Sequence, residues 1–98
     1  MRHARDQDLD RLEPLLEALR ALPGLTEKKR GTFYRKSRAF LHFHENAGSL
    51  YADIRDENGA DFERLDVTGE AERAGLLQTT RARLESGLPR AGGGKPRL

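Results

Sequence analysis

Leucines recur every three or four residues in the first part of the chain. They stand at Leu9, Leu12, Leu15, Leu16, Leu19 and Leu22. This spacing places them on one stripe of an amphipathic helix. Asp10 and Glu13 have the spacing of a capping box, and Pro14 is tolerated in a helix when it falls in the first turn. Because a Pro-Gly pair at 23–24 ends a helix, the pattern predicts one over residues 10–22.

From residue 25 to residue 67 apolar positions alternate with polar ones, as in half-buried strands. Three short segments rich in aromatic and aliphatic residues cover 32–35, 39–44 and 49–55, and a weaker one covers 62–67. Residues typical of turns separate these segments. Connections this short join antiparallel neighbours, because a parallel crossover needs about a dozen residues or more.

A second helix is predicted after the strands. Thr68 is a suitable N-cap, and Gly87 and Pro89 are residues that end helices. The apolar stripe of this helix is narrow and is predicted to consist of Ala74, Leu77, Arg81, Leu84 and Leu88.

The order of helix, four strands and helix predicts an α+β fold. We expect a two-layer domain with an antiparallel four-stranded sheet and an N-terminal and a C-terminal helix on one face. Residues 1–9 are expected to form an N-terminal arm, residues 10–88 a single domain, and residues 89–98 a flexible basic tail.

Strand alternation divides the side chains of the sheet between two faces. The face toward the helices is predicted to hold Phe33, Leu41, Phe43, Leu50, Ala52, Ile54, Leu65 and Val67. The open face is predicted to hold Tyr34, Phe40, His42, His44, Tyr51, Asp53 and Arg55. A shift by one residue would bury the histidines and the charged residues, which is far more costly.

Three segments of the first half carry a family resemblance. They are Leu22-Pro23-Gly24, Gly31-Thr32-Phe33-Tyr34 and Lys36-Ser37-Arg38-Ala39-Phe40-Leu41. Together they resemble the opening half of YjbR-like (MmcQ/YjbR) bacterial proteins, over roughly residues 12–67. The resemblance implies the same α+β layout and a role in nucleic-acid binding. That family continues into further strands with an Asn-Lys and a Trp segment, whereas this chain has no Trp.

Composition excludes several kinds of chemistry. The chain has no Cys, which excludes disulfides, thiol nucleophiles and Cys-ligated zinc. It shows neither a membrane-spanning apolar run nor a signal peptide, so we expect a cytoplasmic protein without a membrane partner. It contains no nucleophile elbow and no phosphate-cradling loop in the right context. No cofactor is therefore expected, and little points to an enzyme.

Charge is distributed unevenly along the chain. Residues 26–45 have a net charge of +4 and residues 53–72 one of −6, although the whole chain is only +2. Cations interleaved with rings are the ingredients of a nucleic-acid surface. The candidate residues are Lys28, Lys29, Arg30, Tyr34, Arg35, Lys36, Arg38 and Phe40. The alternative is that charged strand edges keep a small domain soluble.

A His-x-His pair is the one candidate metal motif. His42 and His44 lie two apart on one predicted strand, so both imidazoles are expected on one face, about 7 Å apart. Asp53 on the next strand is expected to join them. Two imidazoles and a carboxylate can hold a divalent metal and leave positions open for water. The alternatives are an ordinary solvated sheet face and a pH-sensitive contact.

The sequence favours a binding or interaction module that uses the open face. Tyr34, Phe40 and Tyr51 would leave an aromatic patch in water, and pairing two such faces would give a homodimer. The full surface predicted to contact a partner consists of the open-face residues Tyr34, Phe40, His42, His44, Tyr51, Asp53 and Arg55. Nucleic-acid binding through the basic hairpin and tail is the alternative, and a metal-binding protein or enzyme is the third.

Overall fold

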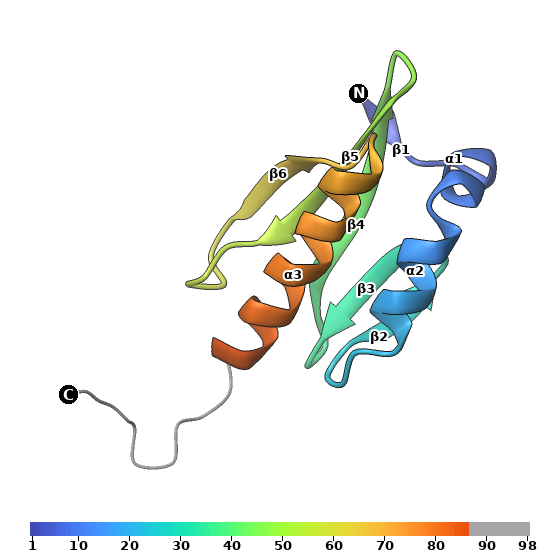
Figure 1. The fold of residues 1–98 in the computed structure, drawn as a ribbon. Coiled ribbons are helices and arrows are strands. Elements are labelled where there is room, and N and C mark those ends of the chain that lie inside the picture. The colour runs from blue at the N-terminus through green and yellow to red at the C-terminus, as the bar shows by residue number, and fades with distance from the viewer. Residues whose placement is uncertain (87–98) are drawn as a thin grey trace, which may run out of the picture.

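Six strands and three helices follow one another along residues 1–86, the part of the chain that this computed structural model describes (Figure 1). In order, they are β1 (Arg2–His3), α1 (Asp6–Arg11), α2 (Glu13–Arg20), β2 (Thr26–Lys29), β3 (Thr32–Arg35), β4 (Arg38–Asn46), β5 (Ser49–Arg55), β6 (Phe62–Asp66) and α3 (Glu70–Ser86). Within residues 1–86, no helix has both the length and the apolar character needed to cross a bilayer.

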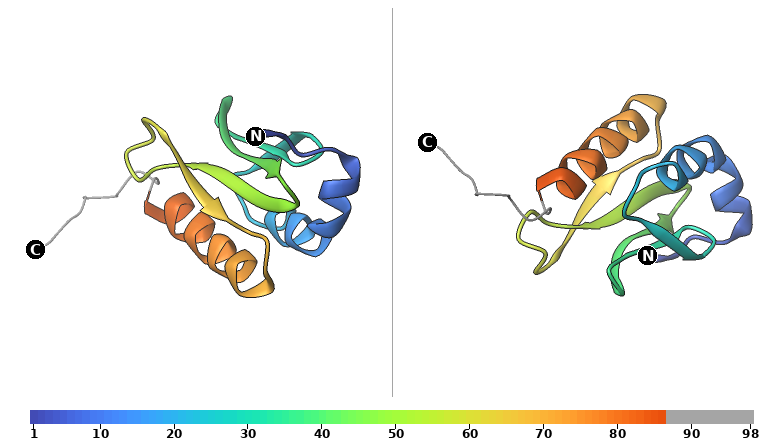
Figure 2. Two further views of the ribbon diagram at one scale, coloured as in Figure 1. Left: turned by 90° about the horizontal axis from the view of Figure 1, so that it is seen from above. Right: turned by 90° about the horizontal axis from the view of Figure 1, so that it is seen from below.

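The strands form one antiparallel sheet in the order β2-β3-β4-β5-β6, and β1 pairs with the far end of β4. Helices α2 and α3 lie beside each other on the same side of the sheet (Figures 1 and 2). The α+β fold predicted from sequence is therefore confirmed, but the predicted number of four strands is wrong. Strand β2 was missed because its residues are polar and mostly exposed, and β1 because it has two residues.

The predicted N-terminal helix is two helices. Helix α1 begins at Asp6, where the side chain of Asp8 accepts a hydrogen bond from the N–H of Arg5 (2.9 Å). The helix is interrupted at Leu12, and α2 begins at the next residue. Pro14 lies in the first turn of α2, where an N–H group has no partner within the helix and its absence costs nothing. Residues 1–9, expected as an arm, hold β1 and the first turn of α1.

The leucines of the first helical segment form the centre of the core with the predicted helix-facing residues of the sheet. Leu12, Leu16 and Leu19 are completely buried. The sheet contributes Phe33, Leu41, Phe43, Leu50, Ala52, Ile54 and Val67, all buried, and Leu65 packs against them. The prediction for this face is confirmed.

Helix α3 packs through a stripe that agrees with the predicted one only in part, since Leu84 is buried and Leu77 packs against the core as expected. Its buried residues are Leu76, Thr80 and Leu84, and the hydroxyl of Thr80 donates to the Leu76 carbonyl (2.8 Å). Ala74 and Arg81, which were expected on the stripe, are exposed. Thr80 takes the place of an apolar residue in the core, because its hydroxyl group is hydrogen-bonded within the helix. The predicted helix end at 87–89 and the basic tail lie outside the described residues.

The predicted cap of α3 also differs. The hydroxyl of Thr68 accepts a hydrogen bond from the N–H of Leu50 (2.9 Å), which ties the chain to β5. The helix entry is instead stabilised by Glu72, whose carboxylate accepts from the N–H of Gly69 (2.8 Å). A carboxylate three residues into a helix commonly satisfies a free N–H in this way.

A bulge in β4 moves one predicted open-face residue into the core. Phe33 pairs with Leu41 but Tyr34 pairs with Ala39, which leaves Phe40 as an extra residue on β4. Phe40 is 5% exposed and belongs to the core, so its predicted place on the open face is wrong. A bulge reverses the alternation locally, and burying a phenyl ring stabilises by about 2–3 kcal/mol.

Candidate metal centre

The open face of the sheet carries two rows of polar side chains across neighbouring strands. In the first row His42 of β4 pairs with Asp53 of β5, which pairs with Arg64 of β6. In the second row His44 pairs with Tyr51 on one side and with His3 of β1 on the other. Side chains that face one another across strands lie within contact distance. The sheet register therefore brings two imidazoles to one carboxylate and a third imidazole, that of His3, beside them.

Asp53 lies at the centre of this group. Its Oδ2 atom is 3.4 Å from Nε2 of His42 and 3.2 Å from Nδ1 of His44. All three ligand atoms lie within 4.8 Å of one another. Asp53 is 6% exposed, and the two histidine side chains are 19% and 12% exposed. A buried carboxylate with two nearly buried imidazoles is the most concentrated chemistry on this face.

Arg64 holds the carboxylate from the other side. Its Nε and Nη2 donate to Oδ1 and Oδ2 of Asp53, both at 2.8 Å. Burial raises the pKa of the Asp53 carboxyl, but the hydrogen bonds and charge of Arg64 outweigh burial and hold this pKa below its ordinary value. Asp53 is thus a carboxylate at neutral pH and can act as a ligand.

The imidazoles are in the form that binds metals. Burial lowers the pKa of His42 and of His44, and this outweighs the attraction of the Asp53 carboxylate for their protons. The Nδ1 atom of His44 is buried and has no hydrogen-bond partner, since its approach to Asp53 does not meet hydrogen-bond geometry. A neutral imidazole with a free nitrogen can coordinate a metal ion.

Two further rings enclose the group. The ring of His3 lies 4.6 Å from that of His44 and 5.7 Å from that of His42, measured between ring centres. Phe62 of β6 lies 4.9 Å from the His42 ring, and the guanidinium of Arg55 stacks over Phe62 at 4.3 Å. The rings of His3 and Phe62 therefore lie against the imidazoles of the centre.

The structure separates two of the predicted partner-face residues, Tyr34 and Phe40, from this centre. Tyr34 lies on β3, where the ammonium of Lys28 is 4.7 Å from its ring centre. Phe40 is buried, as described above. The predicted aromatic patch of Tyr34, Phe40 and Tyr51 is therefore incomplete, and the exposed ring on this face is Phe62 (38% exposed).

The basic residues predicted to bind nucleic acid lie at two ends of the hairpin. Lys28, Lys29 and Arg30 are at the β2–β3 turn, whereas Arg35, Lys36 and Arg38 flank the β3–β4 turn. Arg30 also forms salt bridges with the carboxylates of Asp6, Asp10 and Glu13. The structure does not join the six cations into one surface.

Sequence reasoning missed His3 and Arg64 as members of the centre. Arg64 had a usable signal, because it precedes Leu65, which was assigned to the core face, and alternation then puts Arg64 on the open face. His3 had no such signal, since the pairing of β1 with β4 depends on contacts between distant parts of the chain.

No protein-family model, no curated protein and no solved structure matches this chain. The resemblance to YjbR-like proteins stays a prediction, and the geometry of the site itself carries the functional argument.

Proposed function

We propose that this protein is a metal-binding module whose open sheet face binds a divalent transition-metal ion such as Zn²⁺ through His42, His44 and Asp53. The observation that carries the proposal is the convergence of their two imidazole nitrogens on one carboxylate oxygen, at 3.4 and 3.2 Å. Two imidazole nitrogens and a carboxylate oxygen that converge in this way offer the kind of ligand set that a divalent metal uses.

The spacing of the ligand atoms supports a small cation. Zinc bonds to nitrogen and oxygen are roughly 2.0–2.2 Å long, so tetrahedral ligand atoms lie roughly 3.3–3.5 Å apart. The two measured separations are close to this range. Imidazole and carboxylate ligands favour zinc and its transition-metal neighbours over calcium or magnesium, which prefer oxygen ligands throughout. Because the chain has no Cys, ligands of this kind are the ones it can offer.

Arg64 would orient the carboxylate in the bound state, although its positive charge opposes that of the metal. When Oδ2 of Asp53 binds the metal, Oδ1 keeps its hydrogen bond from Nε of Arg64. Such outer hydrogen bonds orient the carboxylates that bind metals. Three protein ligands leave a fourth position for water or for the exposed imidazole of His3, whose ring is the nearest further one to His44.

Zinc titration followed by calorimetry tests this function with a matched pair of variants. Asp53→Asn removes the central carboxylate, and Asp66→Asn removes a carboxylate two strand positions from Arg64 on the same face. We expect the wild-type protein to bind one Zn²⁺, and Asp53→Asn to weaken binding by at least the ~10–100-fold typical of a lost supporting group. Asp66→Asn should bind like the wild type, because Asn keeps the oxygen that accepts from Thr68. Equal affinities of the two variants, or no binding by the wild type, would reject the proposal.

Self-association through the same face is the second candidate, and the exposure of Phe62 favours it. A second copy of the chain would cover that ring and Tyr51, which lies on the same face of the sheet. Sedimentation over a range of concentrations should detect a dimer that Phe62→Ser abolishes. A monomer at every concentration would contradict this candidate and leave the metal site unaffected.

A further inference from the structure

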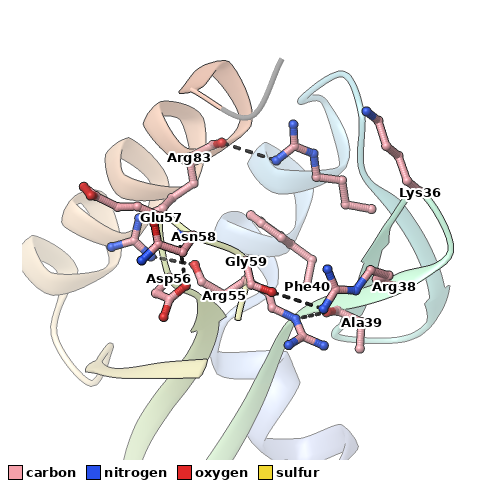
Figure 3. Close-up of a pocket in the computed structure, with 11 residues that line it drawn as sticks. Lys36, Arg38, Ala39, Phe40, Arg55, Asp56, Glu57, Asn58, Gly59 and Arg83 are labelled. Atoms are coloured by element: carbon pink, nitrogen blue, oxygen red, sulfur yellow. Dashed lines mark hydrogen bonds between the residues drawn. The ribbon is translucent and has the colours of Figure 1, made fainter. Parts of the chain in front are cut away.

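The end of the sheet away from the β4–β5 turn holds an open cavity of about 220 Å³. It lies between the β3–β4 turn, the β5–β6 loop and the last turn of α3 (Figure 3). Figure 3 shows the ring of Phe40 in the middle of the group, with Arg38 and Arg55 on one side and Arg83 on the other. The cationic side chains that line this cavity are Arg35, Lys36, Arg38, Arg55 and Arg83.

Neutral carbonyl groups hold three of these arginines in place. Arg38 donates to the carbonyl of Gly59 (3.1 Å), and Arg55 donates to those of Ala39 (2.8 Å) and Ala60 (3.1 Å). Arg35 donates to the carbonyls of Arg83 and Leu84, at 3.3 and 3.2 Å, in the last turn of α3. Carbonyl partners fix the position of a guanidinium without cancelling its charge, and each group keeps further N–H donors.

Several other arginines are neutralised by carboxylates. Salt bridges join Arg2, Arg20 and Arg64 to carboxylates, as they do Arg30. In the described part of the chain, no salt bridge reaches Arg35, Arg38 or Arg55. Three guanidinium groups that are held by carbonyls and not paired with carboxylates therefore lie together at this cavity.

The carboxylates at the cavity compensate this charge only in part. Asp56 uses its oxygens to accept from the N–H groups of Asn58 (3.0 Å), Ala60 (3.1 Å) and Asp61 (3.3 Å), which close the β5–β6 loop. Glu57 is exposed, and Glu63 pairs with Arg83 at 2.6 Å. The cations outnumber the carboxylates, and the attraction for an anion is strengthened beside the buried ring of Phe40.

We propose that this cavity binds a phosphate group, carried by a small phosphorylated molecule or by the end of a nucleic-acid strand. Guanidinium groups form paired hydrogen bonds to phosphate oxygens, and three of them from β3, β4 and β5 can surround one group. This site is separate from the metal centre and does not depend on it. If the phosphate belongs to a nucleic acid, the cations that bind it are those at the β3–β4 turn and not those at the β2–β3 turn.

Inorganic phosphate is the first probe, at low salt, with NMR signals of the arginine Nε–H groups as the readout. The signals of Arg38 and Arg55 should move on titration. Arg38→Gln, and Lys36→Gln as a variant that leaves the carbonyl contacts intact, should each weaken binding about tenfold, as expected for hydrogen bonds or charges lost from an anion. Arg11→Gln is the matched control: Arg11 also donates to a carbonyl, that of Gly48 (3.1 Å), but at the opposite end of β4.

A second probe separates the two sources of the phosphate. A short single-stranded oligonucleotide with a 5′-phosphate is compared with the same strand without it by fluorescence anisotropy. Tighter binding of the phosphorylated strand than of the unphosphorylated one assigns the site to a strand end, and equal binding of the two strands assigns it to a small molecule. The proposal is overturned if neither probe moves the Arg38 and Arg55 signals, or if Arg11→Gln weakens binding as much as Arg38→Gln.

Discussion

At the scale of single residues, Asp53 is the centre of the proposed metal site, and several groups compete for its carboxylate. The same Oδ2 atom accepts from Arg64 and faces His42 and His44. A metal ion and the guanidinium are both positive, so each opposes the other at this carboxylate. Alternation along β4 and β5 was enough to predict that the two histidines and Asp53 share a face, because that alternation is a local property.

Replacing Arg64 with Gln tests this competition. Gln keeps a hydrogen-bond donor for Asp53 but removes the charge, so we expect Zn²⁺ to bind about tenfold more tightly. Calorimetry of the variant against the wild type gives the comparison. An ion-pair network without a metal role would instead leave zinc binding absent in both proteins.

A second carboxylate gives a pH dependence that does not involve the metal centre. Burial raises the pKa of Glu27, but hydrogen bonds from Arg20 and from the N–H of Gly31, with the charge of Arg20, outweigh burial and keep it below 4.5. The folded state therefore favours the carboxylate more than the unfolded state does. This contribution to stability is present above pH 4.5 and is lost as the pH falls through the lower folded pKa.

Urea unfolding at a series of acidic pH values measures this loss. The wild type should lose stability as the pH falls below about 4.5. Glu27→Gln should lose less over the same range, because its amide does not titrate. Parallel curves for the two proteins would contradict the role given to Glu27.

At the scale of elements, the sequence predicted what depends on local periodicity and missed what depends on pairing. The helical leucines and the core face of β5 follow from spacing alone. The bulge that buries Phe40 exists because β3 and β4 pair in a particular register, and no local pattern records it. The stripe of α3 was predicted only in part. Leu84 and Leu77 were expected on it, but Leu76 and the polar Thr80, which is buried between Leu76 and Leu84, were not.

Two glycines at hairpin turns allow a comparison that isolates packing from backbone strain. Gly31 and Gly48 both have positive φ, at 79° and 87°. A Cβ at Gly31 would lie 2.7 Å from a methyl carbon of Leu9, whereas a Cβ at Gly48 would meet nothing within 4 Å. We expect Gly48→Ala to lower the free energy of unfolding by about 1–2 kcal/mol, through backbone strain alone.

Gly31→Ala should cost the same strain and about 1–3 kcal/mol more, because Leu9 is buried and must move. Chemical denaturation of the two variants measures both values. Equal losses of stability would show that Leu9 adapts freely and that the β2–β3 turn is not held against α1.

At the scale of the whole molecule, the fold groups cationic side chains differently from their order in the sequence. The basic hairpin looked like one surface in the sequence, but its cations separate to two turns. Arg30 forms salt bridges with carboxylates, whereas Arg35 and Arg38 line the same cavity as Arg55 and Arg83, which come from other elements. The sequence could not predict this grouping, because it is made by the sheet order and by the packing of α3. Two distinct sites result, one with imidazoles on the sheet face and one with guanidinium groups at its end.

Zinc titration of the wild-type protein, followed through the imidazole ¹⁵N signals of its histidines, tests the central claim most directly. The account predicts that the Nε2 signal of His42 and the Nδ1 signal of His44 shift together and stop shifting at one equivalent of metal. Signals that do not move, or a shift of one of these histidines without the other, would show that the two imidazoles and Asp53 do not hold a common ion.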